Sequence, residues 1–480
     1  MADRRPHVIF ITTDQQRGDA LSINGADPLA TPNLDYLAAS GTNFTRAYAE
    51  VPSCIGARRT MLSGMKPFSH GMVGFYGGVG WALDHSLPGE LSRAGYQTQL
   101  VGKLHMYPHR KRYGFDNMVW ADSQRDNNDY AEWLGDNGAT SLEMGLAHGV
   151  STNGWVGRPS HLDERFSHTT WCVNEALRFI GQRDTDAPFF LWVSFVDPHP
   201  PLTPPLVYWE RYEQMDLPQP YVGDWAPQLD APPPGLSPDA SVMRLREDDL
   251  HRCRAGYYGL VNHVDDQVSR LLKGFRESGL LDDTFVLFTS DHGEMLGDHN
   301  LFRKTWPYEA SIRVPFLARA PEWMDCTGGL TNERPVGLQD VMPTILDAAG
   351  VPIPDSVDGA SVLPYMRGDS PAWRDYLHGE HTACYEPDQG NQWVTDGHEK
   401  LIWYTQTGQE QFFDLDADPS EMHNTLNDAG ASERVAAWRQ RLVNELADRP
   451  EGFVQDGRLV AGQAELRPEQ LQPVTNQVNA

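Results

Sequence analysis

The sequence predicts an α/β protein in which helices sandwich a large, mostly parallel (mixed) sheet, with a smaller C-terminal subdomain made of an antiparallel sheet plus a helix. Two observations support this fold class. Short apolar runs alternate with helical patterns over the first three quarters of the 480 residues, and runs separated by turn residues begin at about residue 376. A chain of this length can bury a large core, so we expect one big domain with a small one attached.

Three apolar runs have the composition of central strands. Each is rich in aromatic and β-branched residues, and none alternates apolar with polar residues. Strands that are covered by helices on both faces show this pattern, because neither face of the sheet meets water. The runs are HVIFITT at 7–13, FFLWVSF at 189–195 and TFVLFTS at 284–290.

Segments with helical spacing of apolar residues lie between these runs. They are clearest at 31–41, 168–182 and 250–279, and each has a glycine at or next to its end. Glycine often terminates a helix because it adopts left-handed backbone angles without strain. Alternation of such helices with buried strands is typical of a mostly parallel sheet.

A proline-rich stretch interrupts the alternation at 198–240, and we expect it to form a long loop over one face rather than regular structure. Further on, residues 392–419 predict antiparallel hairpins and 431–447 a helix. The predicted division is an α/β domain at 1–375, a small α+β subdomain at 376–455, and a polar tail or oligomerisation arm at 456–480.

The composition is that of an ordinary soluble globular protein, with 40% hydrophobic and 22% charged residues. The 39 basic and 66 acidic residues give a net charge of −27. This charge argues against nucleic acid and anionic membrane surfaces as partners, but a small anion can still enter a locally positive cleft. No apolar run approaches the roughly 20 residues that span a bilayer.

The N-terminal sequence MADRRPHVIFITTDQ reaches the charged Asp14 after only a short apolar run, so we interpret it as a buried strand rather than a signal peptide. The cysteines are scattered and odd in number, which predicts neither a disulfide framework nor a CxxC metal site. We therefore expect a cytoplasmic protein. The five cysteines are at positions 54, 172, 253, 326 and 384.

Residues that bind metals or anions follow each of the three predicted strands. A single aspartate at such a position most often caps a helix. Three such groups together favour one cleft, because ligands sit beyond the carboxyl ends of parallel strands. Carboxylate, amide and imidazole donors suit a hard divalent cation such as Ca²⁺, Mg²⁺ or Mn²⁺. The residues are Asp14 and Gln15 after the first strand, Asp197 and His199 after the second, and Asp291 and His292 after the third.

Basic groups are spaced among these residues, at Arg58, Lys103, His105 and Lys304. A divalent metal surrounded by such groups would bind a tetrahedral oxyanion and stabilise the negative charge that develops on its oxygens. Cys54 stands four residues before Arg58, just ahead of a predicted helix. From these residues alone, Cys54 is either a small buried side chain or the nucleophile.

The ordered motifs resemble the formylglycine-dependent sulfatases of the alkaline phosphatase superfamily over nearly the whole chain. The family carries Cys (or Ser)-x-Pro-x-Arg at the start of a helix, and Cys54, Arg58, Ser63 and Gly64 fall at matching positions. The resemblance implies an alkaline phosphatase-like fold. The other similar segments are GKLH (102–105), DPHPPLTPP (197–205), SDHGEMLGDH (290–299), PYEASIRVPF (307–316) and FFDLDADPSEMHN (412–424).

The resemblance implies that Cys54 is oxidised to formylglycine, whose hydrate presents two geminal hydroxyls. One hydroxyl, acidified by the metal, attacks sulfur and forms a covalent sulfate ester. The second then loses its proton, the aldehyde re-forms and sulfate leaves. The implied metal ligands are Asp14, Gln15, Asp291 and His292, with oxidised Cys54 completing the shell.

Roles for the basic residues follow from the same resemblance. Arg58 would hold the formylglycine hydroxyl, and Lys103 the substrate oxygens and the nucleophile. His105 would be the base that collapses the hemiacetal. His199 and Lys304 would contact the sulfate and the bridging oxygen and help the alcohol to leave.

Three positions depart from the common sulfatase pattern. Gly56 replaces the motif proline that the formylglycine-generating maturation enzyme normally reads. Gln15 and His292 stand where many sulfatases have Asp and Asn, and both are similar to the choline sulfatase and phosphonate monoester hydrolase branch. That branch tends to carry an Asn near residue 75, where this chain reads GFYGG (74–78).

The leading hypothesis is a sulfuric ester hydrolase that cleaves a small sulfate monoester. One alternative is hydrolysis of a phosphonate monoester or phosphodiester at the same site. Another is a catalytically impaired anion-binding relative in which Cys54 is not matured. Ca²⁺ is the expected metal, with Mn²⁺ or Mg²⁺ as alternatives, and we expect a homo-oligomer. Candidates for lining the pocket of the alcohol are Tyr76, HRKR (109–112), His381 and the proline-rich loop.

Overall fold

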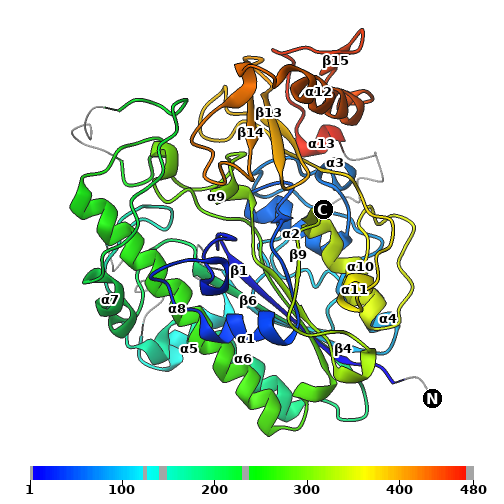
Figure 1. The fold of residues 1–480 in the computed structure, drawn as a ribbon. Coiled ribbons are helices and arrows are strands. Elements are labelled where there is room, and N and C mark those ends of the chain that lie inside the picture. Colours follow the sequence, from blue (N-terminus) through cyan, green and yellow to red (C-terminus); the bar gives the residue numbers. More distant parts are fainter. Residues whose placement is uncertain (1–3, 123–126, 140–148, 230–236, 472–480) are drawn as a thin grey trace.

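The computed structural model describes residues 4–122, 127–139, 149–229 and 237–471. It confirms the α/β fold class: a large eight-stranded sheet, in the order β5-β4-β6-β1-β7-β8-β2-β9, crosses the main body of the molecule (Figure 1). The strands are β1 (His7–Asp14), β2 (Thr42–Phe44), β4 (Gln97–Lys103), β5 (Asn117–Ala121), β6 (Phe189–Pro198), β7 (Thr284–Ser290), β8 (Phe316–Arg319) and β9 (Leu330–Asn332).

The centre of the sheet is parallel, and antiparallel pairs appear only toward one edge. β1 lies between β6 and β7 and is parallel to both, with Ile9 opposite Leu191 on one side and Val286 on the other. β8 runs antiparallel to β7 and to β2. The carboxyl ends of β1, β6 and β7 therefore meet at one edge of the sheet, as the sequence predicts.

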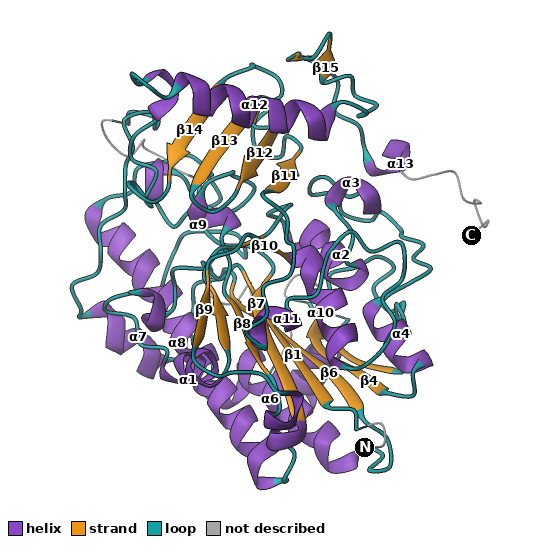
Figure 2. Ribbon diagram, turned by 45° about the vertical axis from the view of Figure 1, so that its right-hand side comes forward, coloured by secondary structure: helices purple, strands orange, loops and turns teal. Residues whose placement is uncertain are grey.

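Helices cover both faces of the sheet. Successive residues of β1 enter cores on opposite faces, which explains why its sequence does not alternate between apolar and polar residues. Val8 and Phe10 enter the core under α2, α4 and α10, whereas Ile9 and Ile11 enter the core under α1, α6 and α8 (Figure 2). Every residue of β1 after His7 is buried. These helices are α1 (Pro32–Ser40), α2 (Cys54–Ser63), α4 (Leu87–Arg93), α6 (His168–Gln182), α8 (Glu247–Glu277) and α10 (Val341–Ala348).

The prediction that 198–240 lacks regular structure was wrong for its first half, which contains α7 (Leu206–Glu213). The prolines of this stretch stand before and after α7, and none lies within it. Pro205 has the extended backbone that precedes a helix, and Tyr208 and Tyr212 are buried as α7 packs on α8. Residues 230–236 lie outside the described part of the chain.

The C-terminal part forms a four-stranded antiparallel sheet with α12 lying across one face (Figure 2). The other face packs on the main body in a core that joins Trp393 and Phe413 to Trp306 and Tyr308. The subdomain boundary at 375/376 stays a prediction. The elements are β11 (Leu377–His381), β12 (Asn391–Thr395), β13 (Glu399–Tyr404), β14 (Glu410–Asp414) and α12 (Ser432–Leu446).

Short elements complete the described chain. Of the predicted tail, 456–471 is described and 472–480 lies outside the described residues. No helix in the described ranges is both long enough and apolar enough to cross a membrane. The short elements are β3 (Ala47–Tyr48), α3 (Pro67–His70), α5 (Asp129–Asp136), α9 (Glu309–Ile312), β10 (Val336–Gly337), α11 (Leu363–Met366), β15 (Val454–Gln455), β16 (Arg458–Leu459) and α13 (Pro468–Leu471).

Candidate active site

Four buried side chains meet beyond the carboxyl edge of the sheet. One ligand atom from each of Asp14, Cys54, Asp291 and His292 lies within 4.8 Å of the others. The register of the sheet explains the first pair: Thr13 lies opposite Ser290, so the residues that follow leave neighbouring strands together. Cys54 joins them as the first residue of α2, where unpaired backbone N–H groups favour negative charge.

His292 presents one ring nitrogen to the cluster. Its Nδ1 lies 2.9 Å from the carbonyl oxygen of Gly293, to which it donates. Its Nε2 lies 3.2 Å from Cys54 Sγ and within 3.6 Å of a carboxylate oxygen of both Asp14 and Asp291. Burial lowers the pKa of His292, but Asp291 and Cys54 together outweigh burial, so the pKa is raised on balance. The raised pKa favours a proton on Nε2, and a cation held by these groups would replace that proton.

Cys54 lies among cations. Lys304 Nζ donates to its sulfur at 3.3 Å, and the side chain is 1% exposed. Burial and Asp14 both raise the pKa of the thiol, yet Lys304, Lys103 and His292 outweigh them and hold the pKa well below 9.0. The surroundings of residue 54 are therefore built to stabilise an anion at the end of this side chain.

Asp14 carries its negative charge inside the protein because Lys103 faces it. Lys103 Nζ lies 2.5 Å from Asp14 Oδ2, and both side chains are buried. Burial alone would raise the pKa of Asp14, but Lys103, His199 and Lys304 together hold it well below the usual value. Burial would likewise lower the pKa of Lys103, and Asp14 raises it instead.

Arg58 lies one helical turn after Cys54 and ties the cluster to the sheet. Its Nε donates to Asp291 Oδ2 at 2.9 Å, while Nη1 donates to the Lys103 carbonyl and to Ser194 Oγ, each at 2.8 Å. Nη2 has no hydrogen-bond partner among the described residues and lies 3.7 Å from Asp14. The predicted contact of Arg58 with residue 54 stays a prediction, whereas its link to Ser194 was not foreseen.

Gln15 follows β1 in a left-handed conformation, with φ of 73°. The hydroxyl of Tyr257 donates to the Gln15 carbonyl at 2.9 Å and accepts from the Arg17 N–H at 2.9 Å, which stabilises the turn. The side-chain oxygen of Gln15 accepts a hydrogen bond from Lys304 at 3.0 Å. This oxygen is thus on the same side as Cys54, where the predicted ligand role requires it.

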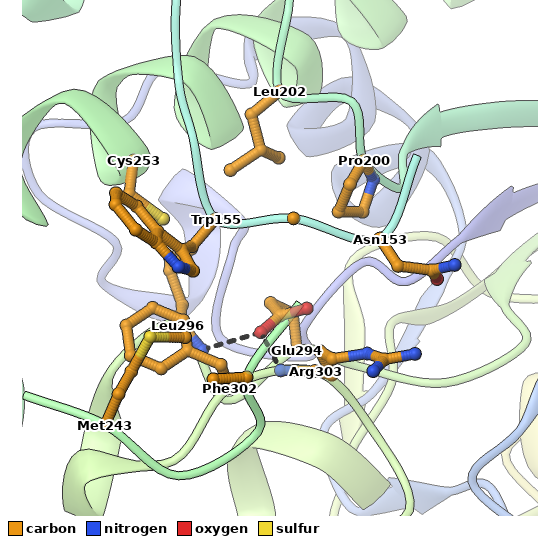
Figure 3. Close-up of a pocket in the computed structure, with 12 residues that line it drawn as sticks. Asn153, Trp155, Pro200, Leu202, Met243, Cys253, Glu294, Leu296, Phe302 and Arg303 are labelled. Atoms are coloured by element: carbon orange, nitrogen blue, oxygen red, sulfur yellow. Dashed lines mark hydrogen bonds between the residues drawn. The ribbon is translucent and has the colours of Figure 1, made fainter. Parts of the chain in front are cut away.

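Glu294 holds the other end of the Gln15 amide, and the sequence analysis missed it. Gln15 Nε2 donates to Glu294 Oε2. Glu294 Oε1 accepts from the backbone N–H groups of Leu296 at 3.0 Å and Arg303 at 2.5 Å (Figure 3). Glu294 also lines a cavity with Trp155 and other largely apolar side chains (Figure 3). The signal in the sequence was the place of Glu294 in the sulfatase-like segment SDHGEMLGDH (290–299).

The second strand end contributes His199 rather than Asp197. His199 Nδ1 donates to the Pro200 carbonyl at 2.7 Å, and Nε2 accepts from Lys304 Nζ at 2.9 Å. Burial and Lys304 hold the pKa of His199 well below its usual value. The carboxylate of Asp197 accepts from Thr169 and lines the same cavity as His199, but Asp197 is not one of the four residues of the cluster.

His105 also has a left-handed backbone, with φ of 55°. Its ring lies edge-on to Phe75 with centroids 6.2 Å apart, and Nδ1 has no hydrogen-bond partner among the described residues. The role of His105 as a base stays a prediction.

The cluster suits a divalent cation. Two carboxylates, one imidazole nitrogen whose proton a cation would replace, and the side chain of residue 54 converge within 4.8 Å, and all four are buried. Asp14 Oδ2 also lacks a hydrogen-bond partner of good geometry in the described chain. Hard oxygen donors of this kind favour Ca²⁺, Mg²⁺ or Mn²⁺. Together with the surrounding cations, the geometry is that of a hydrolase for esters of tetrahedral oxyanions.

Comparison with known proteins gives the family. A family model described as Sulfatase matches residues 6–351, and one described as N-sulphoglucosamine sulphohydrolase, C-terminal, matches 297–448. The chain is 39% identical over 474 residues to an arylsulfatase of Clostridium perfringens. The alignment covers 95% of this chain and 98% of the arylsulfatase. The protein therefore belongs to the sulfatase family, as the motifs predicted.

Two further relatives agree with the predicted branch. A choline-sulfatase of Rhizobium meliloti is 29% identical, with 88% of this chain and 83% of that one covered. The crystal structure of the phosphonate monoester hydrolase of Agrobacterium radiobacter superposes with a TM-score of 0.79 at 26% identity, covering 92% of this chain and 96% of that one. This agreement supports the alkaline phosphatase-like fold.

Proposed function

We propose that the protein hydrolyses a sulfate monoester of a small organic alcohol, with residue 54 as the nucleophile in the form of formylglycine. The observation that supports this proposal is the environment of Cys54. Its sulfur lies within 3.3 Å of Lys304 Nζ and 3.2 Å of His292 Nε2, beside two carboxylates that can hold a divalent cation. An anion at this position, whether thiolate or alkoxide, is stabilised before any substrate arrives.

Each basic residue of the site has a different role in the proposed reaction. Lys103 and Lys304, both buried, neutralise the oxyanion as charge grows on it in the transition state. His199 is neutral at physiological pH and orients Lys304 by accepting a hydrogen bond from its Nζ. Burial and Asp14 raise the pKa of Asp291 on balance, and Arg58 opposes this shift while its hydrogen bond holds the carboxylate in place. A divalent cation held by Asp14, Gln15, Asp291, His292 and residue 54 would lower the pKa of the attacking hydroxyl.

The chemistry of residue 54 is balanced in two steps. A hydroxyl of the formylglycine hydrate gives up its proton to solvent and forms the bond to sulfur while the bond from sulfur to the alcohol oxygen breaks. Lys304, which His199 orients, gives that oxygen a proton so that the alcohol leaves neutral. The other hydroxyl then gives its proton to a base, for which we propose His105. The carbonyl re-forms as the carbon–oxygen bond to sulfate breaks, and one water molecule then adds to the aldehyde to restore the hydrate.

We propose Ca²⁺ as the metal because four of the five expected ligands supply oxygen and only His292 supplies nitrogen, with Mn²⁺ or Mg²⁺ as alternatives. The amide of Gln15 removes one negative charge relative to a carboxylate, which favours a less stringent choice among divalent ions. Elemental analysis of the purified protein, followed by reloading with each ion, tests this assignment.

A phosphonate monoester or phosphodiester is the second candidate substrate, and the TM-score of 0.79 with a phosphonate monoester hydrolase favours it. Both reactions place similar charge on a trigonal-bipyramidal centre, so the same cations serve either. Comparing turnover of 4-nitrophenyl sulfate with that of 4-nitrophenyl phenylphosphonate separates them. A large excess for the phosphonate would overturn the sulfatase proposal.

Conversion of Cys54 is tested independently by the mass of its peptide, since formylglycine is about 18 Da lighter than cysteine. The maturation enzyme would be a required partner. An unmodified peptide from a host that matures other sulfatases would favour the catalytically impaired, anion-binding alternative. A cytoplasmic location and a homo-oligomer remain predictions from the sequence, which cell fractionation and light scattering test.

A further inference from the structure

His381, the last residue of β11, is a buried histidine beside the catalytic cluster that the mechanism above does not use. It is 1% exposed, although it belongs to the C-terminal sheet rather than to the large one. Its Nδ1 lies 2.6 Å from the Thr382 carbonyl oxygen, so this nitrogen carries the proton and donates. Burial, together with the charges of His292 and Lys304, lowers the pKa of His381 to about 4, so the ring is neutral at physiological pH.

Backbone contacts on both sides hold His381 against the segment that leads to Cys54. The Glu380 N–H donates to the Glu50 carbonyl at 2.7 Å, and the Thr382 N–H donates to the Val73 carbonyl at 2.9 Å. Glu50 stands four residues before Cys54 in the sequence.

The neighbouring strand ties the same residue to the segment of Lys304. Asn391 is the partner of His381 across β11 and β12, and its Nδ2 donates to the Thr305 carbonyl at 3.2 Å. His381 therefore lies between the two chain segments that carry the nucleophile and Lys304.

The second ring nitrogen of His381 lacks a partner. Nε2 is buried and has no hydrogen bond in the described chain, and in the neutral ring it is an acceptor. Lys304 has no spare proton for it, because Nζ already contacts Gln15, Cys54 and His199. The N–H of His292 is directed to Gly293. A buried acceptor without a donor costs free energy, so its donor is expected to arrive with a ligand.

That donor belongs to the organic part of the substrate. The oxygens of a sulfate ester are acceptors only, and the cations of the cluster already match them. Next to His381, the hydroxyl of Tyr76 donates to Thr382 Oγ1 at 3.0 Å, and the adjacent Phe75 is 40% exposed. An exposed aromatic side chain that directly precedes Tyr76 suits a flat organic group that carries a hydroxyl or amino group.

We propose that His381 is a specificity-determining residue whose Nε2 accepts a hydrogen bond from a hydroxyl or amino group next to the ester oxygen of the substrate. This inference deepens the proposed function and rests on it. It predicts that esters of vicinal diols, catechols or amino alcohols are favoured over esters of simple alcohols. A site that hydrogen-bonds a substrate hydroxyl discriminates against analogues that lack it.

The test compares 4-nitrocatechol sulfate, which has a hydroxyl beside the ester, with 4-nitrophenyl sulfate, which has none, at a pH where the phenol is protonated. The ratio of kcat/KM for the two esters is measured for the wild type, His381→Leu and His381→Gln. We expect the ratio to fall about ten-fold or more in His381→Leu and to recover in part in His381→Gln, whose amide oxygen is an acceptor. His378→Leu, on the same strand and bonded to Gln392, is the matched control and keeps the wild-type ratio.

An unchanged ratio in His381→Leu would overturn the proposal. So would an equal loss for both esters, because Nε2 would then serve the nucleophile rather than the substrate. If the wild type turns over neither ester, the proposed function fails. The specificity inference is then decided by calorimetric binding of the two esters to the metal-loaded wild type and His381→Gln, where equal affinity of the wild type for both esters refutes it.

Discussion

The side-chain amide of Gln15 lies between two charged side chains. The effect of replacing this amide with a carboxylate can therefore be predicted. Nε2 donates to Glu294 and Oε1 accepts from Lys304 at 3.0 Å. A carboxylate at position 15 would face the carboxylate of Glu294 in a buried setting, where like charges cannot both ionise without cost.

We predict that Gln15→Glu lowers the free energy of unfolding by about 2 kcal/mol in the presence of a chelator, because the two carboxylates repel or one must bind a proton. The exchange variant Gln15→Glu with Glu294→Gln restores a carboxylate–amide pair and should recover most of the loss. Urea unfolding of the single and double variants measures both effects. Equal stability of Gln15→Glu and the wild type would show that the Glu294 contact contributes nothing.

The same substitution should strengthen metal binding, because a carboxylate adds a negative charge beside Asp14 and Asp291. Titration with Ca²⁺ and Mn²⁺ followed by thermal unfolding provides the readout, since at a given concentration a ligand that binds more tightly stabilises the folded protein more.

Glu50 is a buried carboxyl outside the catalytic cluster that makes stability depend on pH. Burial raises its pKa from 4.5 to about 7, although the backbone N–H groups of Leu338 and Gln339 donate to it. A folded-state pKa above the unfolded value means that the fold favours the protonated form. The stabilisation is therefore fully present below about pH 4.5 and is lost as the pH rises through about 7.

Between pH 5 and pH 8 the wild type should lose up to about 3 kcal/mol of stability relative to Glu50→Gln, which cannot ionise. The exposed Glu333→Gln variant is the matched control and should follow the wild type. The measurement is the free energy of unfolding in urea at several pH values. Parallel curves for the wild type and Glu50→Gln would contradict the shift.

At the scale of elements, the start of α2 explains why this chain has glycine where the sulfatase motif has proline. A Cβ at Gly56 would lie 2.7 Å and 2.8 Å from the two methyl carbons of Val51, and 3.1 Å from the Met72 carbonyl oxygen. Any side chain at position 56, proline included, therefore needs Val51 to move. The departure from the motif is thus matched by the packing around α2.

We predict that Gly56→Ala destabilises the protein by about 1 kcal/mol, because overpacking at Val51 exceeds the gain in helix propensity. Adding Val51→Ala should offset much of the loss. Gly181→Ala in α6 is the control, because its Cβ meets nothing within 4 Å and should stabilise the protein slightly. Denaturant unfolding measures the free energy of unfolding of the three variants. If Gly56→Ala is as stable as Gly181→Ala, position 56 is not crowded by Val51.

The sequence predicted the elements whose patterns are local. The buried strands β1, β6 and β7 and the helices α6 and α12 were found because their apolar spacing is set by their own residues. α7 was missed since its flanking prolines dominated the pattern, although Tyr208 and Tyr212 form one apolar face. β11 was missed because its sequence LHGEH is polar and its burial comes from the domain it packs against.

The same limit applies to the candidate site. Asp14, Asp291 and His292 were found because parallel strands bring their carboxyl ends together, and this follows from topology alone. Glu294, Ser194 and Tyr257 support the cluster through contacts between residues far apart in the chain. No local pattern marks such residues, and for the same reason the hydrogen bond of Asp197 with Thr169 could not be predicted.

At the scale of the molecule, the C-terminal sheet is joined to the catalytic body by a buried ionic contact as well as by apolar packing. Lys400 on β13 lies 3.0 Å from Glu309 Oε1 at the start of α9 and 2.6 Å from Glu421 Oε1. All three side chains are buried. α9 lies five residues after Lys304, so this contact couples the C-terminal sheet to the segment that carries a proposed catalytic residue.

Removing the cation leaves the buried carboxylates of Glu309 and Glu421 without the lysine that they share. We predict that Lys400→Met lowers the free energy of unfolding by about 3–5 kcal/mol. The triple variant Lys400→Met, Glu309→Gln, Glu421→Gln removes the charges together and should recover part of the loss, which separates charge burial from packing. Because one core spans Trp306 and Trp393, the two parts should unfold in a single transition, seen at the same denaturant concentration by tryptophan fluorescence and by far-ultraviolet circular dichroism. Two separated transitions would show that the C-terminal sheet folds independently, and residue 381 would then be held near the nucleophile by a weaker interface than the contacts with Glu50 and Thr305 imply.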